Sequence, residues 1–265
     1  MQIKNITIGA DPECFVFNTE ENEFASAIGY IPGTKEIPYQ VDELGEGFAM
    51  QTDNVLAEFN IPASKLFEND DFIVDILSMK NYINEYLEKE QSHLILKPSA
   101  SQFIPEKYLN NEQACLFGCD PDYNAYNQKQ NKKPELIAPN FRSSGFHIHI
   151  GYDNPMIETS LEIIKYLDAY VGIPSIILDK DKNRRTLYGK AGCFRFQRWG
   201  VEWRVLSGAF LQDEKTVRWV QKRVRLAIEA FLKGKQLPPY QKIVSIINKS
   251  NAKQAIELIN EFNLI

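Results

Sequence analysis

The sequence predicts an α+β fold, with a largely antiparallel β-sheet and helices packed on one of its faces. Strand-like runs occur early and late in the chain and long helical patterns lie between and after them, without the regular alternation typical of a parallel sheet. The 265 residues are 44% apolar and 25% charged, which is ordinary for a globular protein with a sizeable core. We expect a single domain over residues 1–265, with C-terminal helices from about residue 212.

The expected strands are short runs in which apolar and polar residues alternate or β-favouring residues dominate. They are residues 3–8, 14–17, 48–60, 93–96, 115–117, 146–152 and 193–206. Gly9-Ala10-Asp11-Pro12 is expected to interrupt the first two runs. Turns at Asp53-Asn54 and at Arg198-Trp199-Gly200 are expected to divide the longest runs into strand pairs.

Helical periodicity predicts helices that begin near residues 69–71, cover residues 161–170 and follow residue 212. The first helix has an apolar stripe, formed by Ile73, Ile76, Leu77, Ile83 and Leu87. The helix after residue 212 has an apolar face too, and its basic side chains are expected to form a solvated face: Arg218, Lys222, Arg223 and Arg225. Residues 29–47 and 124–133 are expected to be loops.

Charge and cysteine content exclude several classes of protein. The 30 basic and 35 acidic residues give a net charge of −5, which argues against a general nucleic-acid binder. No run approaches the roughly 18 apolar residues of a membrane span, and the first residues lack a secretory leader, so we expect no membrane partner and a cytoplasmic location. The scattered cysteines Cys14, Cys115, Cys119 and Cys193 predict reduced, buried thiols; the Cys115 and Cys119 spacing alone cannot supply the four ligands of a structural zinc site.

Acidic residues in two strand-like segments form the first candidate site. Asp11 and Glu13 would point to one face of an extended segment, with Cα atoms roughly 6–7 Å apart. Such a pair needs a compensating cation such as Mg²⁺ or Mn²⁺, unless both acids simply face solvent. Asp53 and Glu58 flank the next strand, and Glu58 lies in an apolar run, where either a core salt bridge or a metal would compensate its charge.

Two of the three histidines project from the same face of one strand. His147 and His149 lie in Gly145-Phe146-His147-Ile148-His149-Ile150-Gly151. A single buried histidine is usually structural, but two imidazoles at this spacing are typical of a metal or phosphate site.

The segment from Arg184 to Arg204 holds six basic residues. Lys190 lies between Gly189 and Gly192 in a loop that could cover a polyphosphate, and Glu202 shares a strand face with Arg204. Guanidinium groups beside carboxylates are typical of phosphoryl transfer, in which arginine stabilises the transferring group and carboxylates hold the metals. A structural ion-pair ladder is the alternative for Glu202 and Arg204.

In their order along the chain, these motifs resemble the phage-type carboxylate-amine (COOH-NH2) ligases, type two. These are small members of the glutamine synthetase and glutamate-cysteine ligase superfamily. The resemblance rests on the acid pair, on Asp53-Asn54-Val55-Leu56-Ala57-Glu58-Phe59-Asn60, on His-Ile-His and on the segment that runs from Tyr188-Gly189 to Gly200-Val201-Glu202-Trp203-Arg204. Phe117-Gly118-Cys119-Asp120-Pro121-Asp122-Tyr123-Asn124-Ala125 resembles the family's own signature. The resemblance covers residues 7 to about 210 and implies the curved sheet of a glutamine synthetase catalytic domain.

The resemblance also implies roles for individual residues. The implied metal ligands are Asp11, Glu13, Glu58, His147 and Glu202, although the superfamily more often has glutamate at the first position. Arg204 resembles the arginine that grips the substrate carboxylate, and with Arg195 and Glu202 it forms the expected catalytic group. The expected nucleotide contacts are His149, Arg185 and Arg198, and the glycine-bounded loop adds Lys190.

The implied activity is ATP- and Mg²⁺-dependent amide-bond formation between a carboxylate and an amine through an acyl phosphate. The expected cofactors are ATP and Mg²⁺, with Mn²⁺ as the alternative metal. The expected partners are a small-molecule or peptide carboxylate and an amine, in the host cytoplasm if the chain is phage-encoded, and self-association is left open. The alternatives are a zinc-dependent hydrolase, built on the histidines and acids, and a catalytically inactive nucleotide-binding phage protein.

Overall fold

An antiparallel β-sheet is the framework of the computed structural model, which describes residues 3–90, 93–115, 122–132 and 137–264. Every strand pairing within these residues is antiparallel. The main path runs in the order β3 (Tyr39–Gln40), β4 (Ala49–Asp53), β5 (Leu56–Asn60), β1 (Thr7–Asn18), β11 (Phe146–Gly151), β13 (Gly200–Trp203), β12 (Cys193–Gln197) and β9 (Tyr123–Asn124). Strands β2 (Glu23–Ala25), β6 (Ser64–Lys65) and β7 (Leu94–Lys97) also pair with β1, and β8 (Ser101–Phe103) pairs with β10 (Phe141–Ser143).

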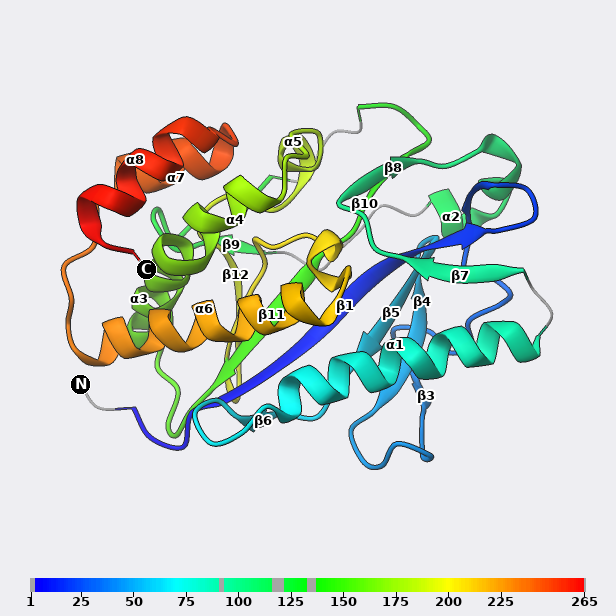
Figure 1. The fold of residues 1–265 in the computed structure, drawn as a ribbon, viewed down its shortest axis with the longest axis horizontal. Helices are drawn as coiled ribbons and strands as arrows, with labels where there is room; N and C mark the ends of the chain where they lie inside the picture. The colour runs from blue at the N-terminus through cyan, green and yellow to red at the C-terminus, as the bar shows by residue number, and fades with distance from the viewer. Residues whose placement is uncertain (1–2, 91–92, 116–121, 133–136, 265) are drawn as a thin grey trace.

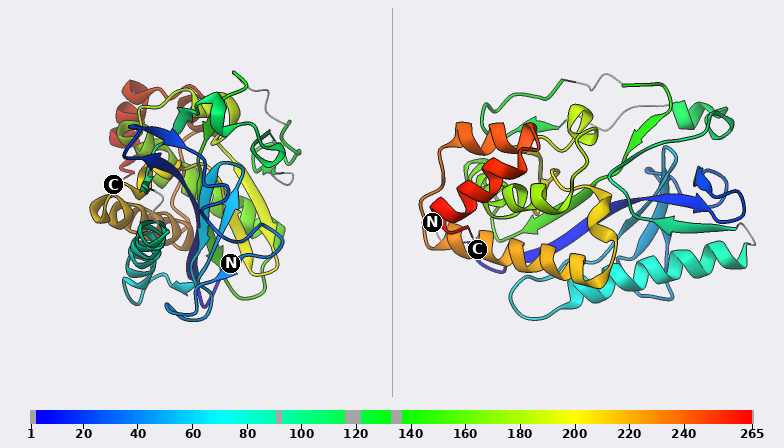
Figure 2. Two further views of the ribbon diagram at one scale, coloured as in Figure 1. Left: turned by 90° about the vertical axis from the view of Figure 1, so that its right-hand side faces the viewer. Right: turned by 45° about the horizontal axis from the view of Figure 1, so that its top comes forward.

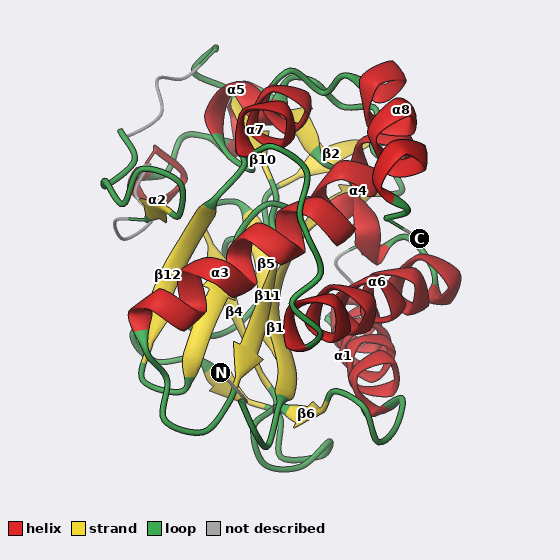
Figure 3. Ribbon diagram, turned by 90° about the vertical axis from the view of Figure 1, so that its left-hand side faces the viewer, coloured by secondary structure: helices red, strands yellow, loops and turns green. Residues whose placement is uncertain are grey.

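The long helices lie together on one side of the main sheet (Figures 1 and 2). They are α1 (Asp71–Lys89), α3 (Ile157–Leu167), α4 (Ile173–Leu178), α6 (Glu214–Leu232), α7 (Tyr240–Asn248) and α8 (Ala252–Phe262). Helix α3 packs on β12 and β13, and α6 packs on both α3 and α1 (Figure 3). Four short turns of helix complete the described elements: η1 (Glu106–Tyr108), α2 (Glu112–Cys115), α5 (Arg184–Leu187) and η3 (Gly208–Leu211). The α+β prediction with an antiparallel sheet is confirmed.

Strand β1 is one continuous strand, so the predicted interruption at Gly9-Ala10-Asp11-Pro12 is wrong. Pro12 lacks a backbone N–H, which normally confines proline to edges and irregular positions of a sheet. Here Pro12 is the last residue paired with β11, and the next residues, Glu13 and Cys14, pair with β5. The proline therefore lies where β1 changes its partner, and pairing along both sides overrides the local turn signal.

Most other predicted elements appear in the structure with adjusted ends. The β4–β5 turn contains Asn54 with φ 55°, a left-handed conformation that asparagine tolerates well. The apolar stripe of α1 is buried as predicted, apart from the half-buried Leu77. The predicted helix 161–170 begins earlier, as α3, and continues into a π-helical segment, η2 (Asp168–Gly172).

Two predicted segments near the middle of the chain differ from expectation. Cys115 ends the short helix α2 rather than starting a strand, and residues 116–117 of that predicted strand lie outside the described residues. Within the predicted loop 124–133, residues 124–132 are described; Asn124 ends β9, and Gln130 bridges back to Tyr123. Cys119, in the family signature, also lies outside the described residues.

The basic side of α6 is only partly solvated, contrary to prediction. Arg218 is exposed, but Arg223 is buried, and its Nε donates to the carbonyl of Tyr170 at 2.6 Å. This guanidinium also donates to the carbonyl of Leu264, so it joins α6 to η2 and to the end of the chain. These hydrogen bonds to backbone carbonyls satisfy donors of the guanidinium, which explains why a buried arginine is tolerated here.

The described cysteine side chains agree with the prediction of reduced, buried thiols. Cys14 and Cys193 are free and buried, and burial raises the pKa of each thiol to about 12. None of the described helices combines the length and apolar character needed to cross a bilayer.

Candidate functional site

The candidate site is a row of polar side chains that crosses five strands on one face of the main sheet. Residues directly opposite each other in paired strands share a face. The register pairs Glu13 with Glu58 and Glu58 with Gln51 on one side of β1. On the other side it pairs Asp11 with His147 and His149 with Glu202. Strand pairing therefore gathers acids and histidines that are almost 200 positions apart in the sequence.

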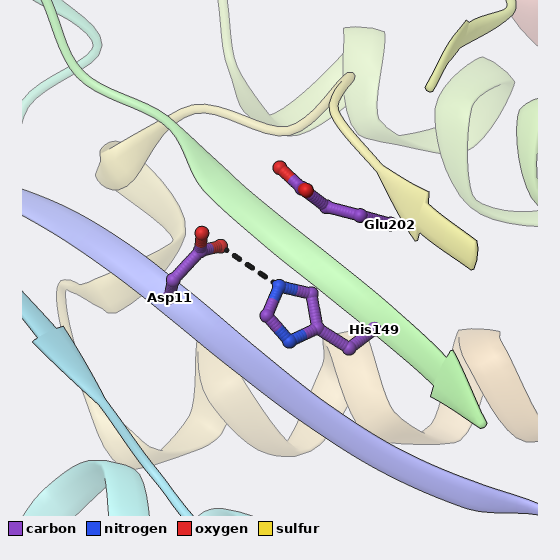
Figure 4. Close-up of side chains that lie close together, drawn as sticks. All are labelled: Asp11, His149 and Glu202. Carbon is purple, nitrogen blue, oxygen red and sulfur yellow. Dashed lines mark hydrogen bonds and ion pairs between the residues drawn. The ribbon is translucent and has the colours of Figure 1, made fainter. Parts of the chain in front are cut away.

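The first cluster consists of Asp11, His149 and Glu202, from β1, β11 and β13 (Figure 4). One ligand atom from each lies within 4.8 Å of the others, and the His149 Nε2 atom is 3.1 Å from Asp11 Oδ1. His147 extends this cluster, because its Nδ1 atom lies 3.3 Å from Asp11 Oδ1 and 3.7 Å from Glu202 Oε1. Two carboxylates and two imidazoles therefore share one partly buried space.

The cations around the first cluster largely compensate its negative charge. Burial raises the pKa of Asp11, but His149 and His147 outweigh this effect and hold that pKa well below its usual range. Burial and Asp11 raise the pKa of Glu202, and Arg204, His147 and Arg195 bring it below the ordinary value. Burial lowers the pKa of His149, and Asp11 reverses the shift, so it is raised overall. Both acids are carboxylates at neutral pH.

The second cluster consists of Glu13, Asp53 and Glu58, from β1, β4 and β5. Its ligand atoms also lie within 4.8 Å of one another, and Glu13 and Glu58 are buried. Burial is the largest influence on Glu58, and the neighbouring Asp11, Asp53 and Glu13 add to it, so the pKa of Glu58 lies well above its usual range. Burial and Glu13 likewise raise the pKa of Asp53, against the opposing effect of Lys35.

The second cluster has a donor set that fits a divalent cation. Three carboxylates meet there with one amino group, Lys35 Nζ, 2.8 Å from Asp53 Oδ2 at the outer side. The Gln51 amide donates to Glu58 Oε2 at 2.8 Å, and its own oxygen, Gln51 Oε1, is buried without a hydrogen-bond partner. Like charges facing one another and an unpaired amide oxygen are both costly in a buried site, and hard oxygen ligands are those that Mg²⁺ and Mn²⁺ prefer.

His147 lies between the two clusters, and Gly145 makes room for it. The His147 Nε2 atom is 3.9 Å from Glu13 Oε1, while its Nδ1 atom faces the first cluster. A Cβ atom at Gly145 would clash with the His147 ring, so any other residue at this position would displace the imidazole. The Gly145 N–H also donates to Glu13 Oε2 at 2.7 Å. The glycine therefore fixes both the imidazole and one acid.

Arginines border the first cluster, one on β12 and one directly after β13. Arg204 is buried, and its guanidinium donates to Glu202 Oε1 and lies 3.2 Å from His147 Nδ1. Its Nε atom lies 3.8 Å from a carboxylate oxygen of Asp122, within the family signature. Arg195 Nη1 lies 3.6 Å from Glu202 Oε1. The structure therefore places Arg204 and Arg195, the two arginines of the expected catalytic group, beside Glu202, whose charge they compensate.

A pocket opens beside the two clusters and exposes several of these groups. Glu13, Asp53, His147 and Arg204 line it, together with apolar side chains such as Phe141. A small concave space with a few convergent charged groups is the usual form of a small-molecule site.

Three predicted nucleotide contacts lie elsewhere. Arg185 is buried and donates to the carbonyl of Gly189, and Lys190 and Arg198 are exposed in loops. The loop around Lys190 faces the protein interior, because Ala191 N donates to Asn248 Oδ1 at 2.8 Å and Gly192 N donates to Asp168 Oδ2 at 2.6 Å. These two amides therefore already have partners within the chain, and the expected contact of this loop with a polyphosphate stays a prediction.

The sequence analysis named Asp53 in the candidate site but not among the metal ligands, and it did not predict Gln51. The two residues are two positions apart on one strand and therefore share a face. Arg142 is buried, and its guanidinium donates to Asn54 Oδ1 at 2.9 Å and to the carbonyl of Ala114 at 2.7 Å. It holds the turn after Asp53, and no local pattern signals this role.

Comparisons with known proteins agree with the resemblance seen in the motifs. The family model described as "Phage phiEco32-like COOH.NH2 ligase-type 2" matches residues 137–247. No curated protein matches the chain. Among solved structures, Plasmodium falciparum glutamine synthetase is 9% identical with a TM-score of 0.46 and is matched over 89% of this chain and 53% of its own.

Two further solved structures match at similar levels. They carry the titles "GmaS/ADP complex-Conformation 1", 12% identical, and "Apo GmaS without ligand", 11% identical. Each has a TM-score of 0.47 and covers 98% of this chain and 64% of its own. The chain thus spans between about half and two thirds of the length of these solved chains. The match over residues 137–247, which include His147, Glu202 and Arg204, confirms that this chain resembles the phage-type carboxylate-amine ligases, type 2.

Proposed function

We propose that the protein is an ATP-dependent ligase that joins a carboxylate to an amine. The observation that carries the proposal is the pair of acidic clusters on one sheet face, of which the first is bordered by Arg204 and Arg195. Arginines beside metal-binding carboxylates are the groups that phosphoryl transfer from a nucleotide requires. The family match is to a group described as ligases, which agrees with this chemistry.

The proposed reaction has two steps. An oxygen of the substrate carboxylate attacks the γ-phosphorus of ATP, and ADP leaves, which gives an acyl phosphate. The amine nitrogen then attacks the acyl carbon, phosphate leaves, and the nitrogen loses a proton. The protein contributes mainly alignment and charge compensation, because an anion that attacks a triphosphate meets strong repulsion.

The residues present fit two divalent cations. The first cluster and His147 would hold one, and the second cluster with the unpaired Gln51 Oε1 would hold the other. When bound, Mg²⁺ or Mn²⁺ would neutralise phosphate oxygens. Arg204 would bind the substrate carboxylate, and Arg195 would contact the transferring phosphoryl group. His149, which was expected near the nucleotide, lies with the first-cluster acids, and we assign it to that metal.

The test is calorimetric titration of ATP into the purified protein with Mg²⁺, with Mn²⁺ and without metal. We expect binding that requires the metal and weakens at least tenfold in Glu202→Gln, because this substitution removes one carboxylate of the first cluster. Glu257→Gln, an exposed position on α8, is the matched control and should bind as wild type. A screen of acids and amines for ADP release would follow.

Metal analysis and activity assays on the same protein distinguish the two alternatives. Zinc that copurifies with the protein, together with ATP-independent amide hydrolysis, would indicate a zinc hydrolase. The arginines at Glu202 have no role in that chemistry. Metal-dependent nucleotide binding without turnover, over a broad range of acids and amines, would indicate an inactive nucleotide-binding protein. Absence of binding with every metal would contradict the ligase proposal.

A further inference from the structure

Asp168 is a fully buried carboxylate outside the two clusters. It begins the π-helical segment η2, a kind of interruption that often occurs at functional sites. Three donors from three different segments converge on it. Trp203 Nε1 donates to Oδ1 at 2.8 Å, while the Tyr126 hydroxyl and Gly192 N donate to Oδ2 at 3.0 and 2.6 Å.

Two of these hydrogen bonds lead to Arg204 by separate routes. Trp203 lies in β13, between the site residues Glu202 and Arg204. Tyr126 lies in the segment 122–131, whose Asp122 carboxylate is 3.8 Å from Arg204 Nε. The carboxylate of Asp168 therefore joins both β13, which ends one residue before Arg204, and the segment that supplies an acid to Arg204.

The segment 122–131 depends on this region for its position. Asn124 donates to the carbonyl of Ala191, and Ala125 N donates to the carbonyl of Gly192, whose own N–H is bound by Asp168. At its other end, Asn131 donates to Asp122 Oδ1 at 3.1 Å. These contacts place Asp122 relative to the Gly192 backbone, and hence relative to Asp168.

The hydrogen bonds offset a large cost of burial. Burial raises the pKa of Asp168 to about 7, against the opposing effects of Trp203, Tyr126, Gly192 and Arg185. A buried carboxylate is retained where its bonds cannot be replaced by apolar packing without loss of geometry.

We propose that Asp168 is a positioning residue for Arg204, which its buried carboxylate holds in place through Trp203 of β13 and through Tyr126 of the segment 122–131. The consequence for substrate binding rests on the proposed ligase function, in which Arg204 binds the substrate carboxylate. The positioning itself is a property of the fold and can be measured without activity.

The test uses Asp168→Asn and Tyr126→Phe in the full chain. An asparagine can accept hydrogen bonds through one side only, so its amide N–H₂ must face either Trp203 Nε1 or Gly192 N, which are both donors. Tyr126→Phe removes a single hydroxyl and tests the second route. Tyr166→Phe is the matched control, because its hydroxyl donates to the carbonyl of Lys235 at 2.6 Å in the helical layer.

Two measurements report on positioning. Hydrogen exchange should accelerate on the order of tenfold in residues 122–131 of Asp168→Asn and Tyr126→Phe, and remain unchanged in α1. The Nε resonance of Arg204 in arginine-labelled protein, identified by its absence in Arg204→Lys, should shift in both variants and not in Tyr166→Phe. Unchanged exchange and an unchanged Arg204 resonance would overturn the proposal, as would equal acceleration in α1.

A double-mutant comparison separates a specific hydrogen bond from general destabilisation. In Asp168→Asn, the new amide N–H₂ can face the Trp203 Nε1–H donor, and adding Trp203→Phe removes that donor. Hydrogen exchange in residues 122–131 should therefore be slower in the double variant than in Asp168→Asn alone. Faster exchange in the double variant would contradict the assignment. In the ligase reaction, Asp168→Asn should raise the KM for the acid about tenfold with little change in kcat. Wild-type protein that binds no metal–ATP would remove the ligase proposal, while the exchange and resonance data would still test Asp168.

Discussion

The two acidic clusters lie on the same sheet face and share β1, yet they differ in how the protein compensates their charge. Around the first cluster, His147, His149, Arg195 and Arg204 oppose the acids, and the pKa values of Asp11 and Glu202 are lowered. In the second cluster the acids face one another, and the pKa of Glu58 is raised.

This difference shows where an external cation would have the larger effect. The first cluster is held by ion pairs within the chain and should keep its geometry without metal. The second cluster has Lys35 at its outer side and an unpaired Gln51 oxygen, so ionising all three acids is unfavourable until a cation enters. Substitutions of acids in the two clusters should therefore change metal-free stability in opposite directions.

The largest expected effect is the loss of stability in Glu202→Gln without metal. The substitution removes the carboxylate nearest to the buried Arg204 guanidinium, and breaking a buried ion pair from one side costs roughly 3 kcal/mol of the free energy of unfolding. Urea denaturation of the metal-free protein would measure it. Glu257→Gln should remain within about 0.5 kcal/mol of wild type. Equal stability of wild type and Glu202→Gln would show that Glu202 and Arg204 are not a compensating pair.

The second effect is the stabilisation that Mn²⁺ provides. At a free concentration of 100 times its Kd, a single bound ion should raise the free energy of unfolding by about 2.7 kcal/mol. Glu58→Gln removes one carboxylate of the second cluster, so most of the gain from that site should disappear. Thermal unfolding at several Mn²⁺ concentrations would measure this gain in wild type, in Glu58→Gln and in the Glu257→Gln control. A full gain in Glu58→Gln would place the ion elsewhere.

The third effect is a gain of stability in metal-free Glu58→Gln, which should depend on pH. Because the pKa of Glu58 in the folded chain lies above its ordinary value of 4.5, its stabilising contribution is complete below that pH and is lost as pH rises through the raised pKa. At pH 8 the variant should therefore be more stable than wild type by about 1 kcal/mol. Unfolding free energies from pH 4 to pH 8 would show a shallower decline in the variant. Parallel curves would contradict the raised pKa.

The smallest expected effect is that of Lys35→Met. Lys35 pairs with Asp53 at the outer side of the second cluster, where its side chain is 41% exposed. Exposed pairs contribute up to about 1 kcal/mol and are screened by salt. The change in stability should therefore be small at low salt and vanish near 1 M salt, as denaturation in both conditions would show. A large, salt-independent loss would mean that Lys35 compensates the cluster far more than its exposure indicates.

The sequence predicted the residue types of the site better than their grouping. The alternation of Asp11 with Glu13, and of His147 with His149, correctly placed each pair on one face, because the strand period is local. The separation into two clusters depends on the pairing register of β1 with β5 and β11, which no single segment encodes. The pairing of β4 with β5 adds Asp53 to the cluster that contains Glu13.

Errors arose where contacts distant in sequence overrode local signals. Pro12 indicated a break, yet it lies at the change of partner in β1. Arg223 was expected on a solvated face, whereas the backbone carbonyls of Tyr170 and Leu264 bind it in the interior. Arg185 and the loop around Lys190 have partners within the chain, and their expected contacts with the nucleotide stay predictions.

The non-local pairing of β1 has a consequence for the order of events during folding. Strand β1 pairs with five other strands. One of its acids, Asp11, shares a cluster with Glu202, which forms an ion pair with Arg204. Such long-range contacts form late and slowly, since loop closure must precede them. During synthesis, the first cluster cannot be complete until about residue 204 has emerged from the ribosome, whereas the second cluster draws only on residues up to Glu58. Metal loading of the first cluster should therefore be a late event that accompanies closure of the sheet.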